Sequence, residues 1–252
     1  MSRTVIFAAA ALALAAWQPL GTAAASESAI AQIKTIGIIS ALGDTLHHVY
    51  VGATAFTNDT EGSEEIADWK LDDTVIAEFT SQLAGRFDVR PVTYSRSDFS
   101  AAASGTHSER DFGERIGRTK PDGSAAYDAY IIVRNIENND FVARTNQHLF
   151  GPGLYRRHGI FGGNMDAVFV SCDVTIVDGH TGKEIDTIVM LTPGGESLFF
   201  PGQPAQHAIK DLWDDHFILP PDQRRQVQDA FKTMLHDGIA LSLRRLELVP
   251  KT

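Results

Sequence analysis

The segment that most limits the possible folds is residues 166–178, with the sequence DAVFVSCDVTIVD. Apolar side chains alternate along it, and a period of two residues is typical of a β-strand. The turn from Gly179 to Lys183 contains two glycines, and residues 184–191 then return as another strand. One face of the first strand is aliphatic, and it consists of Val168, Val170, Cys172, Val174 and Ile176. The segment therefore predicts a β-hairpin that has to bury an apolar face against other elements.

Other stretches complete a pattern of strands and helices. Short apolar runs predict further strands at residues 33–40, 49–56, 89–94 and 127–134. Apolar side chains recur every three or four residues in residues 71–87 and 223–248, which predicts two amphipathic helices. The expected order is β-β-α-β-β-β-β-α. We therefore predict an α/β (α+β) fold with one mixed β-sheet of about five to six strands and two long helices packed on one face.

Residues 1–25 have the composition of a secretory signal peptide. A short positive start precedes an apolar run, then Pro19 and Gly21, and finally small residues with an Ala-x-Ala end. The apolar run is shorter than the roughly 20 residues that a membrane-spanning helix needs. We predict cleavage after about Ala25, a single globular domain over residues 26–252, and a periplasmic or secreted location in a bacterium.

Charge and cysteine content exclude several classes of function. The chain carries 22 basic and 32 acidic residues, a net charge of −10, and such a surface repels the phosphates of nucleic acids. Its one cysteine, Cys172, has no partner for an intramolecular disulfide. Cys172 lies in the middle of an aliphatic strand face, where burial raises a thiol pKa, so we predict a packing role.

Recognisable catalytic motifs are missing from the sequence. It contains no phosphate-binding Gly-x-x-x-x-Gly-Lys-Ser/Thr loop and no Gly-x-Ser-x-Gly nucleophile turn. Asp44, His47 and His48 have the side chains of metal ligands, but adjacent histidines in an extended segment point apart. We therefore predict no cofactor and favour structural or exposed histidines. The alternative is a metal-dependent hydrolase without a known motif, centred on these three residues.

A long segment, residues 135–165, has no clear periodicity and is expected to be an irregular insertion. Within it, residues 149–163 combine aromatic side chains with a local basic patch. Aromatic and Arg side chains in loops are typical of binding surfaces. The candidate partner-binding residues are Phe150, Tyr155, Arg156, Arg157, His158 and Phe161. An equally weighted alternative is an irregular hairpin whose aromatic side chains cover the edge of the sheet.

The turn from Val177 to Ile185 resembles a hairpin of bacterial envelope accessory proteins, in which an Asp ends one strand and a Thr-Gly-Lys/Glu turn follows. The preceding order of strand, acidic loop, amphipathic helix and strand is similar to the amino-terminal domain of the Tol-system translocation protein and to the curli-secretion lipoprotein group. The chain lacks the lipidated cysteine of the lipoproteins. The resemblance implies a binding or assembly role in the envelope, with a protein or membrane-surface partner, and no catalysis.

Overall fold

In a computed structural model of the chain, the residues described are 30–52, 60–100, 112–118, 127–158, 164–192, 205–209 and 219–250. The predicted leader, residues 1–25, lies outside these ranges, and so does Phe161. Among the described residues, no helix combines the length and the apolar character that crossing a bilayer requires.

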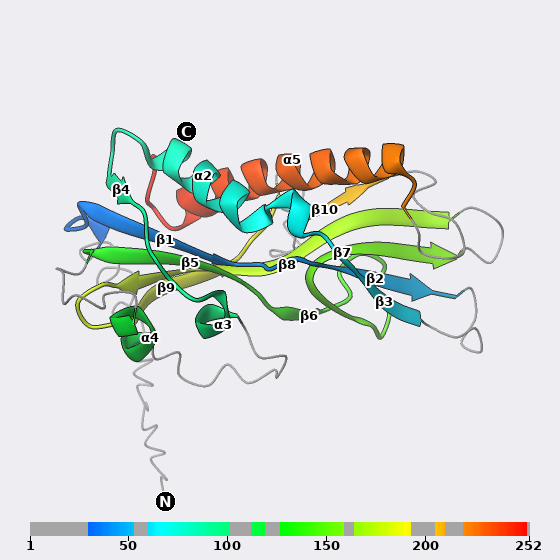
Figure 1. The fold of residues 1–252 in the computed structure, drawn as a ribbon, viewed down its shortest axis with the longest axis horizontal. Coiled ribbons are helices and arrows are strands. Elements are labelled where there is room, and N and C mark those ends of the chain that lie inside the picture. The colour runs from blue at the N-terminus through cyan, green and yellow to red at the C-terminus, as the bar shows by residue number, and fades with distance from the viewer. Residues whose placement is uncertain are drawn as a thin grey trace, which may run out of the picture.

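The secondary structure consists mainly of strands (Figure 1). The strands are β1 (Thr35–Ala41), β2 (Thr45–Val51), β3 (Thr60–Glu65), β4 (Asp88–Arg90), β5 (Ala129–Asn135), β6 (Glu137–Asn139), β7 (His148–His158), β8 (Asn164–Asp178), β9 (Glu184–Val189) and β10 (Ala205–Ala208). The helices are η1 (Ala67–Trp69), a short 3-10 turn, then α2 (Leu71–Leu83), α3 (Arg96–Phe99), α4 (Gly113–Arg118) and α5 (Pro221–Arg245).

One mixed sheet contains all ten of these strands, with the main order β3-β2-β7-β8-β5-β1-β4. Strand β1 is parallel to β4 and β5, and β2 is parallel to β7, whereas the other pairs are antiparallel. The long strand β8 joins the two ends of the sheet: its second half pairs with β5 and β9, and its first half with β7 and β10. The sheet is larger than predicted because segments outside the predicted strands contribute β3, β6, β7 and β10.

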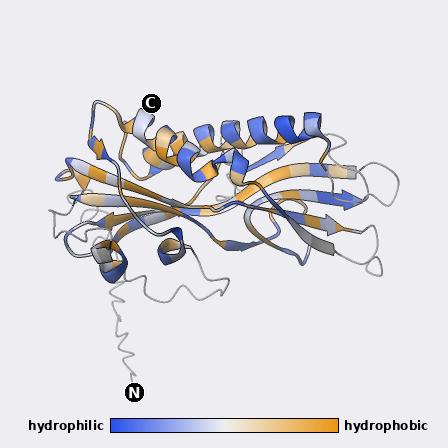
Figure 2. Ribbon diagram, viewed as in Figure 1, coloured by the Kyte–Doolittle hydropathy of each residue, from blue (hydrophilic) through white to orange (hydrophobic). Residues whose placement is uncertain are grey.

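Helices α2 and α5 both cover the same face of the sheet, as Figure 1 shows. Their apolar sides face the strands, whereas the outer surface of α5 is hydrophilic (Figure 2). The core beneath them includes Phe79 of α2, Phe231 of α5 and the predicted aliphatic face of β8. Cys172 is fully buried there. Burial of amphipathic stripes against a sheet is the main favourable term in such a fold.

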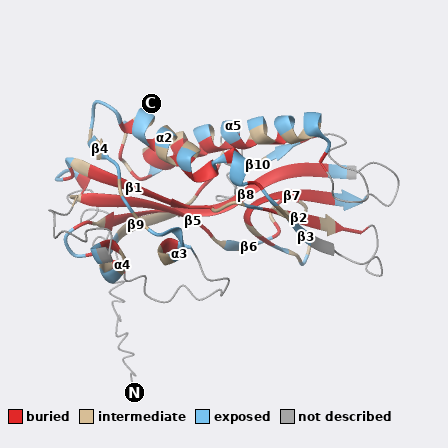
Figure 3. Ribbon diagram, in the orientation of Figure 1, coloured by how far each residue is buried: buried red, intermediate tan, exposed pale blue. Residues whose placement is uncertain are grey.

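The opposite face of the sheet is also buried, which the sequence did not predict. At one end, Tyr130 and Ile132 of β5 pack against Phe99 of α3 and Phe112, which directly precedes α4. At the other end, Tyr155 and Phe169 belong to a separate apolar cluster together with Val49, Val51, Val142, Leu149 and Ala167. Figure 3 accordingly shows the middle of the sheet as buried.

A buried carboxylate fixes the start of α2 against the end of β1. The Asp72 carboxylate accepts hydrogen bonds from the Ser40 hydroxyl at 2.6 Å and from the backbone N–H groups of Leu42 and Gly43 at 2.9 and 3.3 Å. Arg96 of α3 lies 2.7 Å from the same carboxylate. Burial raises the pKa of Asp72, and the hydrogen bonds and Arg96 act in the opposite direction. One side chain therefore joins β1, α2 and α3.

Candidate binding pocket

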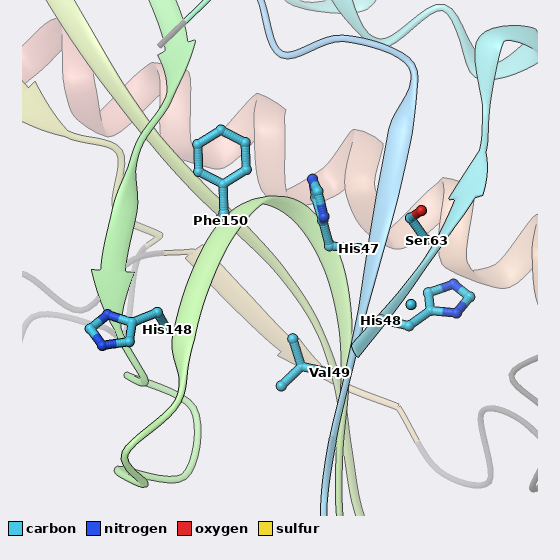
Figure 4. Close-up of a pocket in the computed structure, with 7 residues that line it drawn as sticks. His47, His48, Val49, Ser63, His148 and Phe150 are labelled. Carbon is cyan, nitrogen blue, oxygen red and sulfur yellow. The ribbon is translucent and has the colours of Figure 1, made fainter. Parts of the chain in front are cut away.

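The three strands β2, β3 and β7 border a pocket of about 320 Å³ that is open to solvent (Figure 4). Three imidazoles and one phenyl ring contribute to its wall, beside small or aliphatic residues. Its lining residues are His47, His48, Val49, Gly62, Ser63, His148 and Phe150. Ser63 and His148 are exposed, so side chains at the rim of the pocket are accessible from solvent.

Strand alternation explains which side chains face the pocket. His47 and Val49 lie on one face of β2, and the intervening His48 lies on the other. The His47 ring meets the Phe150 ring edge-on, with the ring centroids 5.5 Å apart. Figure 4 shows these two rings side by side, with the His48 ring pointing away from them. The partners of His47 and His48 on β3 are Ser63 and Gly62, whose small size leaves the space beside the rings open.

His48 is a structural histidine on the face that α5 covers. Its Nε2 atom lies 3.8 Å from Oε2 of Glu64. Glu64 forms an ion pair with Arg224 at the start of α5, and Arg224 also donates to Asp68 at 2.9 Å. Burial, together with the neighbouring His47, lowers the pKa of His48 to about 4. The His48 ring is therefore neutral at pH 7 and packs inside the fold.

The buried position of His48 predicts that the protein loses stability in mild acid. In the unfolded chain a histidine pKa is about 6.5, so between pH 6.5 and 4 the unfolded state binds more protons than the folded state. The free energy of unfolding should therefore fall by about 2 to 3 kcal/mol from this group between pH 7 and pH 4. Urea unfolding at a series of pH values measures the effect.

The matched comparison uses His48→Gln and His158→Gln, because His158 is an exposed histidine on the neighbouring strand β7. The His48→Gln variant should lose this part of the pH dependence, whereas the His158→Gln variant should keep it. An unchanged pH profile in His48→Gln would show that His48 does not titrate below its ordinary range.

The residues predicted to bind a partner have three different environments. Tyr155 and Arg156 are buried: the Tyr155 hydroxyl donates to Asp140 at 2.7 Å, and the Arg156 guanidinium pairs with Asp166. Phe150 lines the pocket, and Arg157 and His158 are exposed at the end of β7. Phe161 lies outside the described residues. Tyr155 and Arg156 are therefore held inside the fold, so the accessible candidates are Phe150, Arg157 and His158.

The segment expected to be irregular forms a hairpin of β7 and β8, preceded by the short strand β6. Asp140 organises the turn between β6 and β7, because its carboxylate accepts hydrogen bonds from the backbone of Val142, Ala143 and Thr145. A hairpin is thus observed, but its strands lie inside the sheet and do not cover its edge as the alternative interpretation expected.

The candidate metal ligands do not converge. The Asp44 carboxylate forms an ion pair with Arg96, and His47 and His48 lie on opposite faces of β2. Within the described ranges, no three His, Cys, Asp or Glu side chains are close enough together to hold a metal ion. Among the described residues, Asp44, His47 and His48 therefore do not come together as ligands of one ion, because adjacent strand residues point in opposite directions.

Four pocket residues were not among the candidate site residues, namely Val49, Gly62, Ser63 and His148. His148 and Phe150 are two residues apart in a strand, so alternation places them on one side, but the strand itself was not recognised. Gly62 and Ser63 fall between the strand predicted at residues 49–56 and the helix predicted at residues 71–87. They line the pocket because β3 pairs with β2, and the sequence of β3 alone does not indicate that pairing.

Comparisons with known proteins give little further information. No protein-family model matches the chain, and no curated protein matches it significantly. Among solved structures, the chain is similar to protein XCC0632 from Xanthomonas campestris, described as belonging to family DUF330, with 8% sequence identity and a TM-score of 0.37. The match covers 86% of this chain and 85% of the other. None of these comparisons supports the resemblance to Tol or curli proteins.

Proposed function

We propose that the chain is an exported module of the bacterial cell envelope that works by binding a protein partner, and that the pocket between β2, β3 and β7 is its binding site. The leader-like composition of residues 1–25 supports export. The observation that carries the binding role is the pair of His47 and Phe150 beside an accessible rim. Concave sites with aromatic walls and a few polar groups are where proteins commonly bind ligands and partner side chains.

The buried carboxylates already have hydrogen-bond or ion-pair partners inside the fold, which favours a binding role over a catalytic one. Asp140 accepts hydrogen bonds from its own turn, and Asp166 and Asp173 pair with Arg156 and Arg134. A catalytic carboxylate needs access to a substrate, whereas these groups are used to hold strands and turns together. Burial raises the pKa of Cys172, which keeps its thiol protonated and unreactive.

Site-specific photocrosslinking in intact cells tests this proposal. A photoreactive amino acid replaces His148, whose side chain is 59% exposed at the rim of the pocket. We expect a crosslinked adduct of one defined mass in the periplasmic fraction. Adding Phe150→Ala should reduce the yield of that adduct about tenfold, because it removes an aromatic wall of the site.

The control carries the same photoreactive group at Lys232, which is 52% exposed on the outer surface of α5. The Lys232 position should not give the same adduct. Equal adducts from both positions, or an adduct that Phe150→Ala leaves unchanged, would refute the pocket as the binding site. A protein found only in the cytoplasm would refute the envelope role.

A further inference from the structure

Strand β3 ends the sheet on the side of the pocket. Among the described strands it pairs only with β2. The backbone N–H of Ile66 donates to the Asp44 carbonyl at 2.7 Å, so position 66 faces β2. Inward and outward positions alternate in an antiparallel ladder, so the backbones of Glu64 and Gly62 also face β2. The N–H and C=O groups of Ser63 and Glu65 are therefore directed toward the outer edge, where an added strand can pair with them.

The same stretch of β3 adjoins the pocket. Ser63 lines the pocket and is the cross-strand partner of His47, which contacts Phe150. A partner side chain that enters beside Ser63 from the outer edge first passes this small residue and then reaches the rings of His47 and Phe150. Neighbouring side chains on one sheet face lie within about 5 Å of each other across paired strands, so an aromatic group can reach them.

The charge around this edge is negative. Glu65 is exposed two residues beyond Ser63, on the same side of the strand. On the other rim, the Glu137 carboxylate lies 3.3 Å from Nδ1 of His148. None of the described residues that line the pocket is Lys or Arg, and the whole chain has a net charge of −10. The edge therefore favours a cationic partner over an acidic one.

We infer that the partner binds through an extended, cationic segment that adds to β3 as a new edge strand, with one aromatic or large apolar side chain in the pocket. This inference rests on the proposed function. Backbone hydrogen bonds to Ser63 and Glu65 supply the pairing, and alternate side chains supply the specificity. The side chain beside Ser63 enters the pocket, and a Lys or Arg two residues away on the same face meets Glu65.

The acidic edge also selects against a second copy of this chain. Two β3 strands paired edge to edge would bring their glutamates together, and like charges across a strand pair are destabilising. The same carboxylates that prevent self-association attract a basic segment. The acidic edge of β3 therefore disfavours pairing with strands that carry like charge and favours pairing with a basic strand.

A labelled peptide tests the inference directly on the full mature chain. The peptide Thr-Lys-Val-Phe-Val-Lys-Thr places two lysines and one phenylalanine on the same face of a strand. Fluorescence anisotropy should show saturable binding. Ser63→Pro should weaken binding about tenfold or more, because it removes an outward N–H and leaves the hydrogen bonds to β2 in place. Glu65→Lys should also weaken binding about tenfold at low salt.

Matched controls separate pairing from charge and from misfolding. Asp229→Lys makes the same charge change on the exposed side of α5 and should leave the affinity unchanged. A peptide with both lysines replaced by glutamate should not bind, and neither should one in which the phenylalanine and both valines are N-methylated, because this removes N–H donors in either strand orientation. Circular dichroism and thermal unfolding check that Ser63→Pro is folded. If that variant is unfolded, Glu65→Lys and the methylated peptide decide the outcome.

The outcomes distinguish this inference from the proposal beneath it. Peptide binding that survives Ser63→Pro and backbone methylation would overturn strand addition. Absence of peptide binding, together with a pocket-specific crosslink at position 148 in cells, would overturn the cationic strand and leave the binding function standing. Absence of both the peptide complex and the crosslink would overturn both.

Discussion

Replacing Arg156 with methionine should lower the free energy of unfolding by about 3–5 kcal/mol. The Arg156 guanidinium donates two parallel hydrogen bonds to Asp166, at 2.7 and 2.6 Å. The two side chains are only 7% and 1% exposed. Removal of the arginine leaves a carboxylate that is buried without its counter-charge, which is far more costly than loss of an exposed pair. Urea denaturation monitored by circular dichroism measures the change.

Two further variants show whether the cost comes from the unpaired charge. Arg157→Met changes the next residue, which is exposed and donates to the Ala143 carbonyl, and should shift stability by no more than about 0.5 kcal/mol. The double variant Arg156→Met with Asp166→Leu should recover most of the loss, because it removes both charges from the interior. Equal, small effects of Arg156→Met and Arg157→Met would mean that the buried pair is not formed.

Gly179→Ala should destabilise the protein by at least about 3 kcal/mol. A Cβ atom at this position would lie 1.7 Å from the carbonyl oxygen of Tyr127 and 2.8 Å from its carbonyl carbon. Backbone atoms cannot rotate away as a side chain can, so the turn or the start of β5 has to move. The Gly179 N–H also donates to the Asp128 carbonyl at 2.9 Å, and that movement would break this bond. Thermal and urea unfolding measure the loss.

A glycine in open space provides the control for that substitution. A Cβ on Gly117 of α4 meets nothing within 4 Å, and alanine is the better helix former. Gly117→Ala should therefore be neutral or slightly stabilising, by up to about 1 kcal/mol. Similar losses in both variants would mean that the clash at Tyr127 is not what constrains the turn.

The elements with strong periodicity were predictable, and those that depend on distant partners were not. The alternation in β8 and the apolar stripes of α2 and α5 lead directly to the observed core. Strand β7 was missed because its sequence contains Gly151, Pro152 and Gly153, which normally weaken a strand. The structure uses Gly153 to accept the ring of Phe169, which comes within 2.1 Å of where a Cβ would be. That requirement arises only after β7 and β8 have paired.

Some of the pocket residues were predicted to be functional, but under two separate hypotheses. His47 was a candidate metal ligand and Phe150 a candidate partner contact, and the structure places their rings together. Nothing in either segment indicates the other, since β2 and β7 are far apart in the chain and meet as parallel strands. The burial of Arg156 was not predicted for a similar reason. Its burial depends on Asp166 in the adjacent strand, which a local reading of charge does not reveal.

The parallel pairing of β1 with β5 and of β2 with β7 also affects how fast the chain can fold. Each of these pairs joins segments that are widely separated in sequence. The chain therefore loses conformational entropy by closing a long loop before the stabilising contacts can form, and this slows folding. A polypeptide with this connectivity remains unfolded for longer than a helical bundle of similar size. Under the export that we propose, such a delay would leave the new chain unfolded while it passes through a translocation channel.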